Sequence, residues 1–148
     1  MKVYTVQSDN FLDNIDSEGS IDNETDKEYS IFDYKNTIEA LNWMTKKYEE
    51  KISSKIDKEM IWVWNNLRDS NFPTQENYYI YVFEVPMEYF KNKILWSDFI
   101  DWHLVLNQIE KDSWDDIFNV NPKKRKPCVQ GVTTFLKKDW FLKRIKFK

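Results

Sequence analysis

The sequence of 148 residues is long enough for one domain that buries a core without disulfides or metals. Its 41% hydrophobic and 17% aromatic residues exclude a disordered chain, and its 2 glycines exclude the glycine-rich loops that bind phosphates. The formal net charge is only −3, but residues 123–148 hold ten Lys and Arg against one Asp, so this end is basic and residues 1–122 are acidic.

Two scarce residue types limit the possible sites. With one cysteine, Cys128, and one histidine, His103, the chain lacks the usual ligands of a structural zinc site, so we expect no bound metal.

No apolar run reaches the roughly 20 residues that cross a bilayer. The first ten residues lack the apolar core of a signal peptide, so we expect a cytoplasmic protein that does not engage a membrane.

The first thirty residues predict a strand, a helix and a loop. Residues 2–7 are rich in β-branched and aromatic types, which is typical of a strand. Ser8 is a suitable N-cap for a helix, and Gly19 is well placed to end it. Residues 16–30 are acidic and polar, and we expect them to form a flexible loop.

The middle of the chain predicts a second helix and two strands. Asn36 is the expected N-cap, with Glu39 as its capping-box partner, and apolar residues then recur every three or four positions to Ile52. Residues 61–64 (IWVW) are too short and too β-prone for a helix and predict a strand. Residues 78–85 have apolar groups on both faces and predict an interior strand.

The last third completes the predicted fold. Residues 94–96 predict a short strand, and Ser97 is the expected N-cap of a helix that begins at Asp98. Residues 128–136 and 140–147 predict two final strands. The pattern indicates an α+β fold in which residues 1–148 form one domain, with a mixed or antiparallel sheet and three or four helices.

The segment LWSDFIDWHLVLN places His103 beside the apolar stripe of its predicted helix. One interpretation is structural: the ring packs beside Trp102, and its nitrogens bond a backbone carbonyl or a carboxylate such as Asp98. The other makes His103 a catalytic proton carrier, because the pKa of imidazole lies near neutrality. A triad of His103 with Cys128 and an acid depends on geometry that sequence does not give.

The aromatic residues of the two middle strands also have two interpretations. They could stack on a base or a sugar, since stacking suits flat ligands. They could instead form the hydrophobic core, as aromatic residues usually do. The residues in question are Trp62, Trp64, Tyr79 and Tyr81.

Four segments in one order carry a resemblance that covers nearly the whole chain: YTVQ, IWVW, LWSDFIDWHLVLN and PCVQGVTTFL. Together they resemble an uncharacterised bacterial domain-of-unknown-function family, with W-T-I-Q, L-S-D-F-x-x-W-H-x-V-L-N and V-Q-A-T-F-W-like motifs. Tyr4 stands where the first motif has tryptophan, and Gly131 interrupts the last one. The family label implies no activity.

The order of elements is also similar to the ADP-ribosyltransferase fold, in which NAD lies in a cleft between two small sheets. This resemblance implies that Thr5 or Gln7 anchors the nucleotide and that Tyr79 or Tyr81 stacks on it. It also implies that Gln130 is the late polar residue, a catalytic candidate beside His103. The usual catalytic glutamate has no counterpart, and Gln130 carries no charge to replace it.

The sequence therefore leaves two alternative functions. The first is an ADP-ribosyltransferase-like enzyme that binds NAD or another phosphate-bearing nucleotide. The second is a binding or regulatory module without chemistry, whose aromatic and charged surfaces engage a protein or nucleic-acid partner. Nucleic-acid contact would involve the basic run Lys123, Lys124, Arg125 and Lys126.

Overall fold

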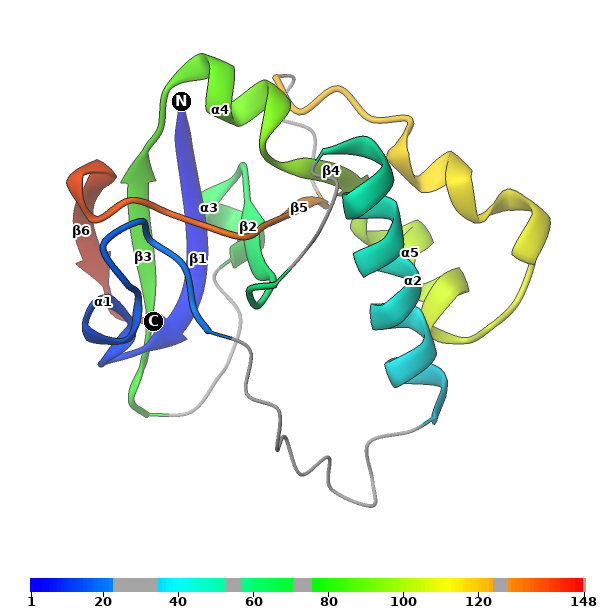
Figure 1. The fold of residues 1–148 in the computed structure, drawn as a ribbon, viewed down its shortest axis with the longest axis horizontal. Helices are drawn as coiled ribbons and strands as arrows, with labels where there is room; N and C mark the ends of the chain where they lie inside the picture. Colours follow the sequence, from blue (N-terminus) through cyan, green and yellow to red (C-terminus); the bar gives the residue numbers. More distant parts are fainter. Residues whose placement is uncertain (23–34, 53–56, 71–75, 124–127, 148) are drawn as a thin grey trace.

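The computed structural model describes residues 1–22, 35–52, 57–70, 76–123 and 128–147. Six strands form one antiparallel sheet in the order β4-β5-β2-β1-β3-β6, together with several helices (Figure 1). This confirms the predicted α+β fold. The strands are β1 (Lys2–Ser8), β2 (Ile61–Trp64), β3 (Tyr78–Glu84), β4 (Leu95–Asp98), β5 (Val129–Thr133) and β6 (Phe141–Ile145).

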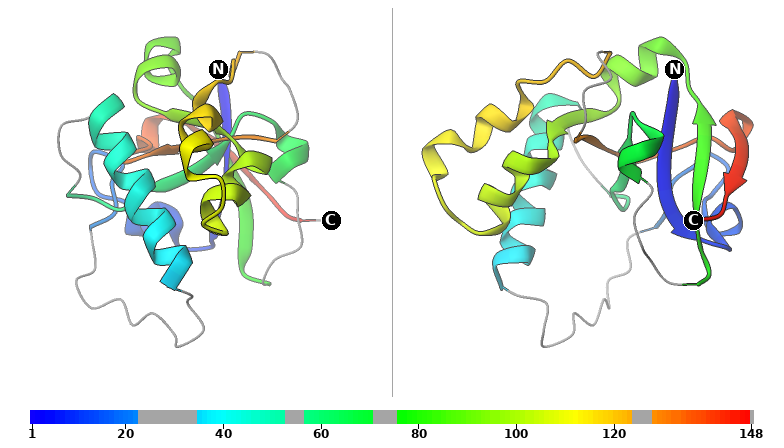
Figure 2. Two further views of the ribbon diagram at one scale, coloured as in Figure 1. Left: turned by 90° about the vertical axis from the view of Figure 1, so that its right-hand side faces the viewer. Right: turned by 180° about the vertical axis from the view of Figure 1, so that it is seen from behind.

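The helices lie on both faces of this sheet, and Figure 2 shows α2 and α5 near its β4 edge. They are α1 (Phe11–Asn14), α2 (Lys35–Lys51), α3 (Leu67–Ser70), α4 (Met87–Asn92) and α5 (Phe99–Leu106), with the 3-10 helices η1 (Lys111–Phe118) and η2 (Lys138–Trp140).

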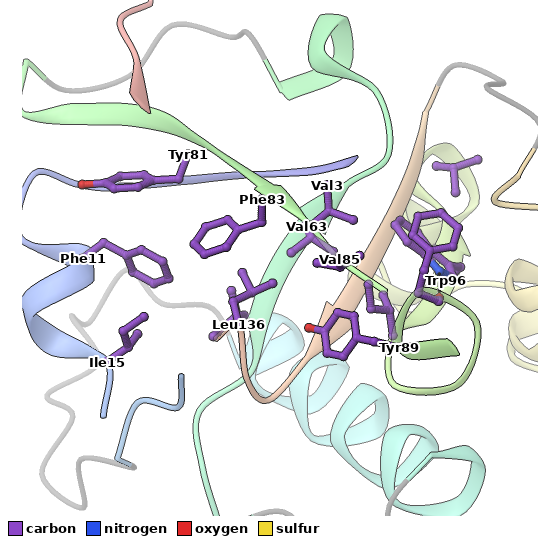
Figure 3. Close-up of a cluster of buried hydrophobic side chains, with 14 residues drawn as sticks. Val3, Phe11, Ile15, Val63, Tyr81, Phe83, Val85, Tyr89, Trp96 and Leu136 are labelled. Carbon is purple, nitrogen blue, oxygen red and sulfur yellow. Dashed lines mark hydrogen bonds between the residues drawn. The ribbon is translucent and has the colours of Figure 1, made fainter. Parts of the chain in front are cut away.

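Each face of the sheet has its own hydrophobic core. On one face, Phe11 of α1 and Tyr89 of α4 belong to a core that also contains Phe83 of β3 (Figure 3). On the other face, α2, α5 and η1 pack around Met44, Trp102 and other buried side chains. Burial on both faces explains why β2 and β3 are apolar at nearly every position.

The helix ends differ from the sequence-based expectations. Asp98, and not Ser97, caps α5, because its side chain accepts the backbone N–H of Asp101 at 2.9 Å, while Ser97 lies buried in β4. The helix predicted after Ser8 is a single turn that ends at Asn14. Helices α3, α4 and η1 were not predicted, since each is short or irregular and lacks a long helical period.

Two predicted features of the acidic half fall partly outside the described residues. Asn36, the expected cap, lies inside α2, and its side chain is outside the described part, as are residues 23–30 of the acidic loop. The described start of that loop is an ordered turn: Gly19 has φ +86°, and its carbonyl accepts the N–H of Leu136 at 2.9 Å. Gly19 therefore anchors this turn and does not end α1.

The resemblance to the ADP-ribosyltransferase fold implied two small sheets. The described strands form one sheet, in which a single residue pair, Tyr4 with Trp64, joins the β4-β5-β2 half to the β1-β3-β6 half. The predicted basic C-terminal strands are β5, which is interior, and β6, which is an edge strand. Exposed Lys143 and Arg144 on β6 give that edge a positive charge, which disfavours pairing with further strands.

The turn that begins at Asp16 makes the fold sensitive to acid. The Oδ1 atom of Asp16 accepts the N–H groups of Ser20 and Glu18 at 3.0 and 2.9 Å, and Lys58 lies 3.6 Å from Oδ2. The N–H of Ser20 first, and then that of Glu18, hold the pKa of Asp16 below its ordinary value. The ionised carboxylate therefore stabilises the fold at neutral pH, and this contribution is lost as the pH falls through the lowered pKa.

We expect Asp16→Asn to lower the midpoint of thermal unfolding at about pH 7 and to have a smaller effect once the pH has fallen through the lowered pKa of Asp16, where the native carboxyl is itself protonated. Thermal melts of both proteins across this range measure the difference. Glu18→Gln, which removes an exposed charge from the same turn, is the control. A difference between Asp16→Asn and wild type that stays constant with pH contradicts this role.

Candidate functional site

The sheet opens between β1 and β2. Strand β1 pairs with β3 along its whole length, from Lys2 to Ser8, but it pairs with β2 only at Tyr4 and Trp64. Beyond this pair the Oγ1 atom of Thr5 donates to the carbonyl of Trp62 at 2.7 Å. The side chain of Thr5 thus takes the place of a backbone hydrogen bond between β1 and β2. The space beside this side chain is left for other groups.

A pocket of about 590 Å³, which we call the β1–β2 pocket, lies at this opening on the face that α2 and α5 cover. This volume is within the range of about 300–1,000 Å³ that is typical of small-molecule sites. Aromatic and aliphatic side chains and two amides line the pocket, and none of the described lining residues is charged. They are Val6, Gln7, Leu41, Met60, Trp62, Trp64, Tyr78, Trp102, Leu106 and Gln130.

Gln130 is the buried polar group of this pocket. Its backbone lies between Trp64 on β2 and Ser97 on β4, and its side chain is 4% exposed. The Nε2 atom has no hydrogen-bond partner among the described residues. A buried donor without a partner costs about 1–3 kcal/mol, so such a group in a pocket indicates a ligand or an ordered water.

Gln7 belongs to a hydrogen-bond chain with a defined direction. The hydroxyl of Thr5 has one proton, which it donates to Trp62, so it can only accept from its other neighbour. That neighbour is Nε2 of Gln7, at 3.0 Å. The amide of Gln7 is therefore oriented, with its Oε1 atom left to accept a hydrogen bond from another group.

Comparison with known proteins gives a family. A family model described as "Domain of unknown function (DUF3841)" matches residues 2–110, most of the chain. The chain belongs to the DUF3841 family. No curated protein and no solved structure matches it. This confirms the expected membership of an uncharacterised family, whereas the individual motifs and the similarity to ADP-ribosyltransferases stay predictions.

The matched part of the DUF3841 domain contains every residue that lines the β1–β2 pocket except Gln130. Gln130 comes from β5, which the topology inserts between β4 and β2. The pocket is therefore completed by a residue that lies twenty positions beyond the end of the family match.

The structure of this DUF3841 domain brings some predicted binding residues together and separates others. Gln7 and Gln130 line one pocket, and Thr5 is fully buried behind Gln7. Tyr81 lies in the core of the opposite face, where its hydroxyl donates to the carbonyl of Ser8 at 2.6 Å. The ring of Tyr79, also on that face, is covered by Arg144 at 4.0 Å.

The two tyrosines predicted to stack on a ligand therefore lie on the face of β3 opposite the pocket. Side chains alternate along a strand, so Tyr78 lies on the face opposite Tyr79 and Tyr81, and it is Tyr78 that lines the pocket. Trp62 and Trp64, the other stacking candidates, do line it, and Trp102 of α5 was missed in this role. The alternation of side chains separates the two faces of β3, but it does not indicate which face lines a pocket.

His103, a catalytic candidate, does not line the pocket. It is exposed on α5, and its Nδ1 atom lies 3.0 Å from the carbonyl of Phe99, whose ring it meets edge-on at 5.0 Å. A contact with a backbone carbonyl was one of the structural interpretations of this histidine. The carbonyl and the ring of Phe99 account for the position of the imidazole ring without any reactive partner.

Cys128 is a poor candidate for a nucleophile. Burial first, and then the negative charges of Asp69 and Asp98, raise the pKa of its thiol, which disfavours the reactive thiolate. Its backbone has φ +67°, and its N–H donates to Oδ2 of Asp69 at 2.7 Å. This contact between the end of α3 and the start of β5 gives the segment a structural role.

Three other expectations concern metal binding, membrane crossing and nucleic-acid contact. No group of three or more possible metal ligands occurs among the described residues. Within the same part of the chain, no helix has both the length and the apolar character needed to cross a membrane. Lys124, Arg125 and Lys126 lie outside the described residues, so nucleic-acid contact by this basic run stays a prediction, although Lys123 is described and exposed.

Proposed function

We propose that this protein binds the planar heteroaromatic ring of a nucleoside or nucleotide in the β1–β2 pocket. The observation that carries the proposal is the buried, unpartnered amide of Gln130 in a pocket lined by tryptophans. NAD is the first ligand to test, because each of its two ring systems is a flat heterocycle.

The aromatic lining supports a flat ligand. Trp62 and Trp102 lie with their ring centroids 5.6 Å apart at 46°, and the ring of Trp64 is held by the edge of Phe99 at 5.0 Å. Tryptophan faces held in this way offer stacking surfaces to a base, and such stacking contributes about 1–3 kcal/mol per base. The contacts with α5 orient the rings before a ligand arrives.

The uncharged lining supports binding without catalysis. None of the described residues around the pocket is a carboxylate, an imidazole or an amine, which are the groups that move protons or stabilise a developing charge. Transfer of ADP-ribose passes through a cationic centre, and an amide such as Gln130 supplies no charge for it. We therefore favour the binding module over the enzyme.

Titration with NAD, with adenosine, with uridine and with nicotinamide tests the proposal, with tryptophan fluorescence as the signal. We expect quenching that saturates for at least one of these compounds, because three tryptophans line the pocket. Replacing Trp62 with leucine should raise the Kd of that compound at least about tenfold, since a stacking surface is lost.

The matched control is Trp140→Leu. Trp140 is a partly buried tryptophan that packs against the core of the opposite face, with its ring 4.6 Å from that of Tyr89. Thermal melts of both variants establish that they are folded. No saturable change with any of the four compounds up to millimolar concentration refutes the proposal, as does an equal loss of affinity in the two variants.

A further inference from the structure

We infer that the β1–β2 pocket recognises an amide edge of its ligand, in which a carbonyl stands next to an N–H. Gln130 donates to the carbonyl and Gln7 accepts from the N–H. Primary carboxamides and lactam bases such as uracil present this edge. The inference rests on the proposed function and deepens it by naming the class of ligand.

The acceptor is assigned to Gln7 by the hydrogen-bond chain behind it. Thr5 is fully buried and gives its only proton to the carbonyl of Trp62, so the nitrogen of Gln7 must face Thr5. Rotation of the Gln7 amide by 180° would place two acceptors, Oε1 and Oγ1, against each other. Gln7 is therefore held as an acceptor toward any group in the pocket.

Gln130 can serve as the donor, because no described contact fixes the orientation of its amide and its Nε2 atom has no acceptor. The Nε2 atom carries two protons, and no described protein atom accepts either of them, although the residue is 4% exposed. A ligand carbonyl would satisfy this donor. A ligand carboxylate would bring a charge into a pocket where no described residue provides a counter-charge. The pocket therefore favours the amide over the corresponding acid.

Two pairs of probes test this on the wild-type protein. Nicotinamide and 3-acetylpyridine share a ring and a carbonyl, but a methyl group replaces the NH₂ in the second compound. In 3-methyluridine a methyl group replaces the proton that uridine carries on N3. We expect the compound with the N–H to bind about tenfold more tightly in at least one pair, as measured by equilibrium dialysis.

Two variants, in which methionine replaces a glutamine side chain of similar length, then separate the acceptor role from the donor role. Gln7→Met should abolish the preference within the pair and leave the affinity for the compound without N–H unchanged. Gln130→Met should weaken both members about equally and preserve the preference. If a variant does not fold, the wild-type comparison decides alone. Equal binding of both members of each pair by the wild type overturns this inference and leaves the proposed function standing. Failure of all four compounds to bind also overturns the inference, and it refutes the proposed function only if NAD and adenosine do not bind either.

Discussion

Replacing Gly19 with alanine is expected to lower the free energy of unfolding by about 3 kcal/mol or more. Gly19 has φ +86°, a conformation that an L-residue adopts at a cost, and its added Cβ would lie 2.2 Å from the carbonyl oxygen of Leu136. The obstacle is backbone, which cannot rotate away as a side chain can. Chemical denaturation monitored by tryptophan fluorescence measures the change.

The control for this variant is Ser17→Ala in the same turn. Ser17 is exposed, and substitution of such a residue changes stability by about 0.5 kcal/mol or less. A loss below about 1 kcal/mol for Gly19→Ala would contradict the close approach of this turn to residues 136–137. It would mean that the turn moves away from the sheet at little cost.

Truncation of Phe83 to alanine is expected to destabilise the protein by about 3–5 kcal/mol. Phe83 is 0% exposed in the first core and faces Phe11 of α1 (Figure 3). The ring centroid of Phe83 lies 6.4 Å from that of Phe11 and 5.7 Å from that of Phe141, both in T-shaped contacts. Its removal leaves a cavity between α1, β3 and β6, because strands held in a ladder cannot collapse into it.

Leu142→Ala provides the comparison for Phe83. Leu142 follows Phe141 on β6 and is 51% exposed, so its truncation removes little buried area. We expect a change of about 0.5 kcal/mol or less from the same denaturation experiment. A loss for Phe83→Ala no larger than that for Leu142→Ala would contradict the stabilising role of the buried Phe83 ring.

The strands were the part of the fold that sequence predicted best. Residues 61–64 and 78–84 are strands in the structure, and β3 is interior, as its two apolar faces predicted. Helix α2 was predicted from its three- and four-residue spacing. The predicted N-caps Ser8 and Ser97 were wrong because a serine before an apolar run is also typical of a strand end, and only backbone geometry separates the two.

The candidate site was predicted in part. The resemblance to a nucleotide-binding fold singled out Gln7 and Gln130, and the structure places both in one pocket. It also singled out Tyr79 and Tyr81, and the segment around His103 suggested a proton carrier; these three residues lie elsewhere. Alternation assigns the tyrosines to one face of β3, but whether that face meets a core or a pocket depends on the elements that cover it.

The sequence by itself determined the strands of this protein, helix α2 and the separation of the strand faces. These follow from periods of two and 3.6 residues, which the backbone imposes within a few positions. Only the tertiary structure decided that β1 and β2 part after Tyr4 and Trp64, and that Gln7 and Gln130 line one pocket at the opening. The physical reason is that this shared pocket depends on the strand order and on one short pairing between segments far apart in the chain, which no local pattern encodes.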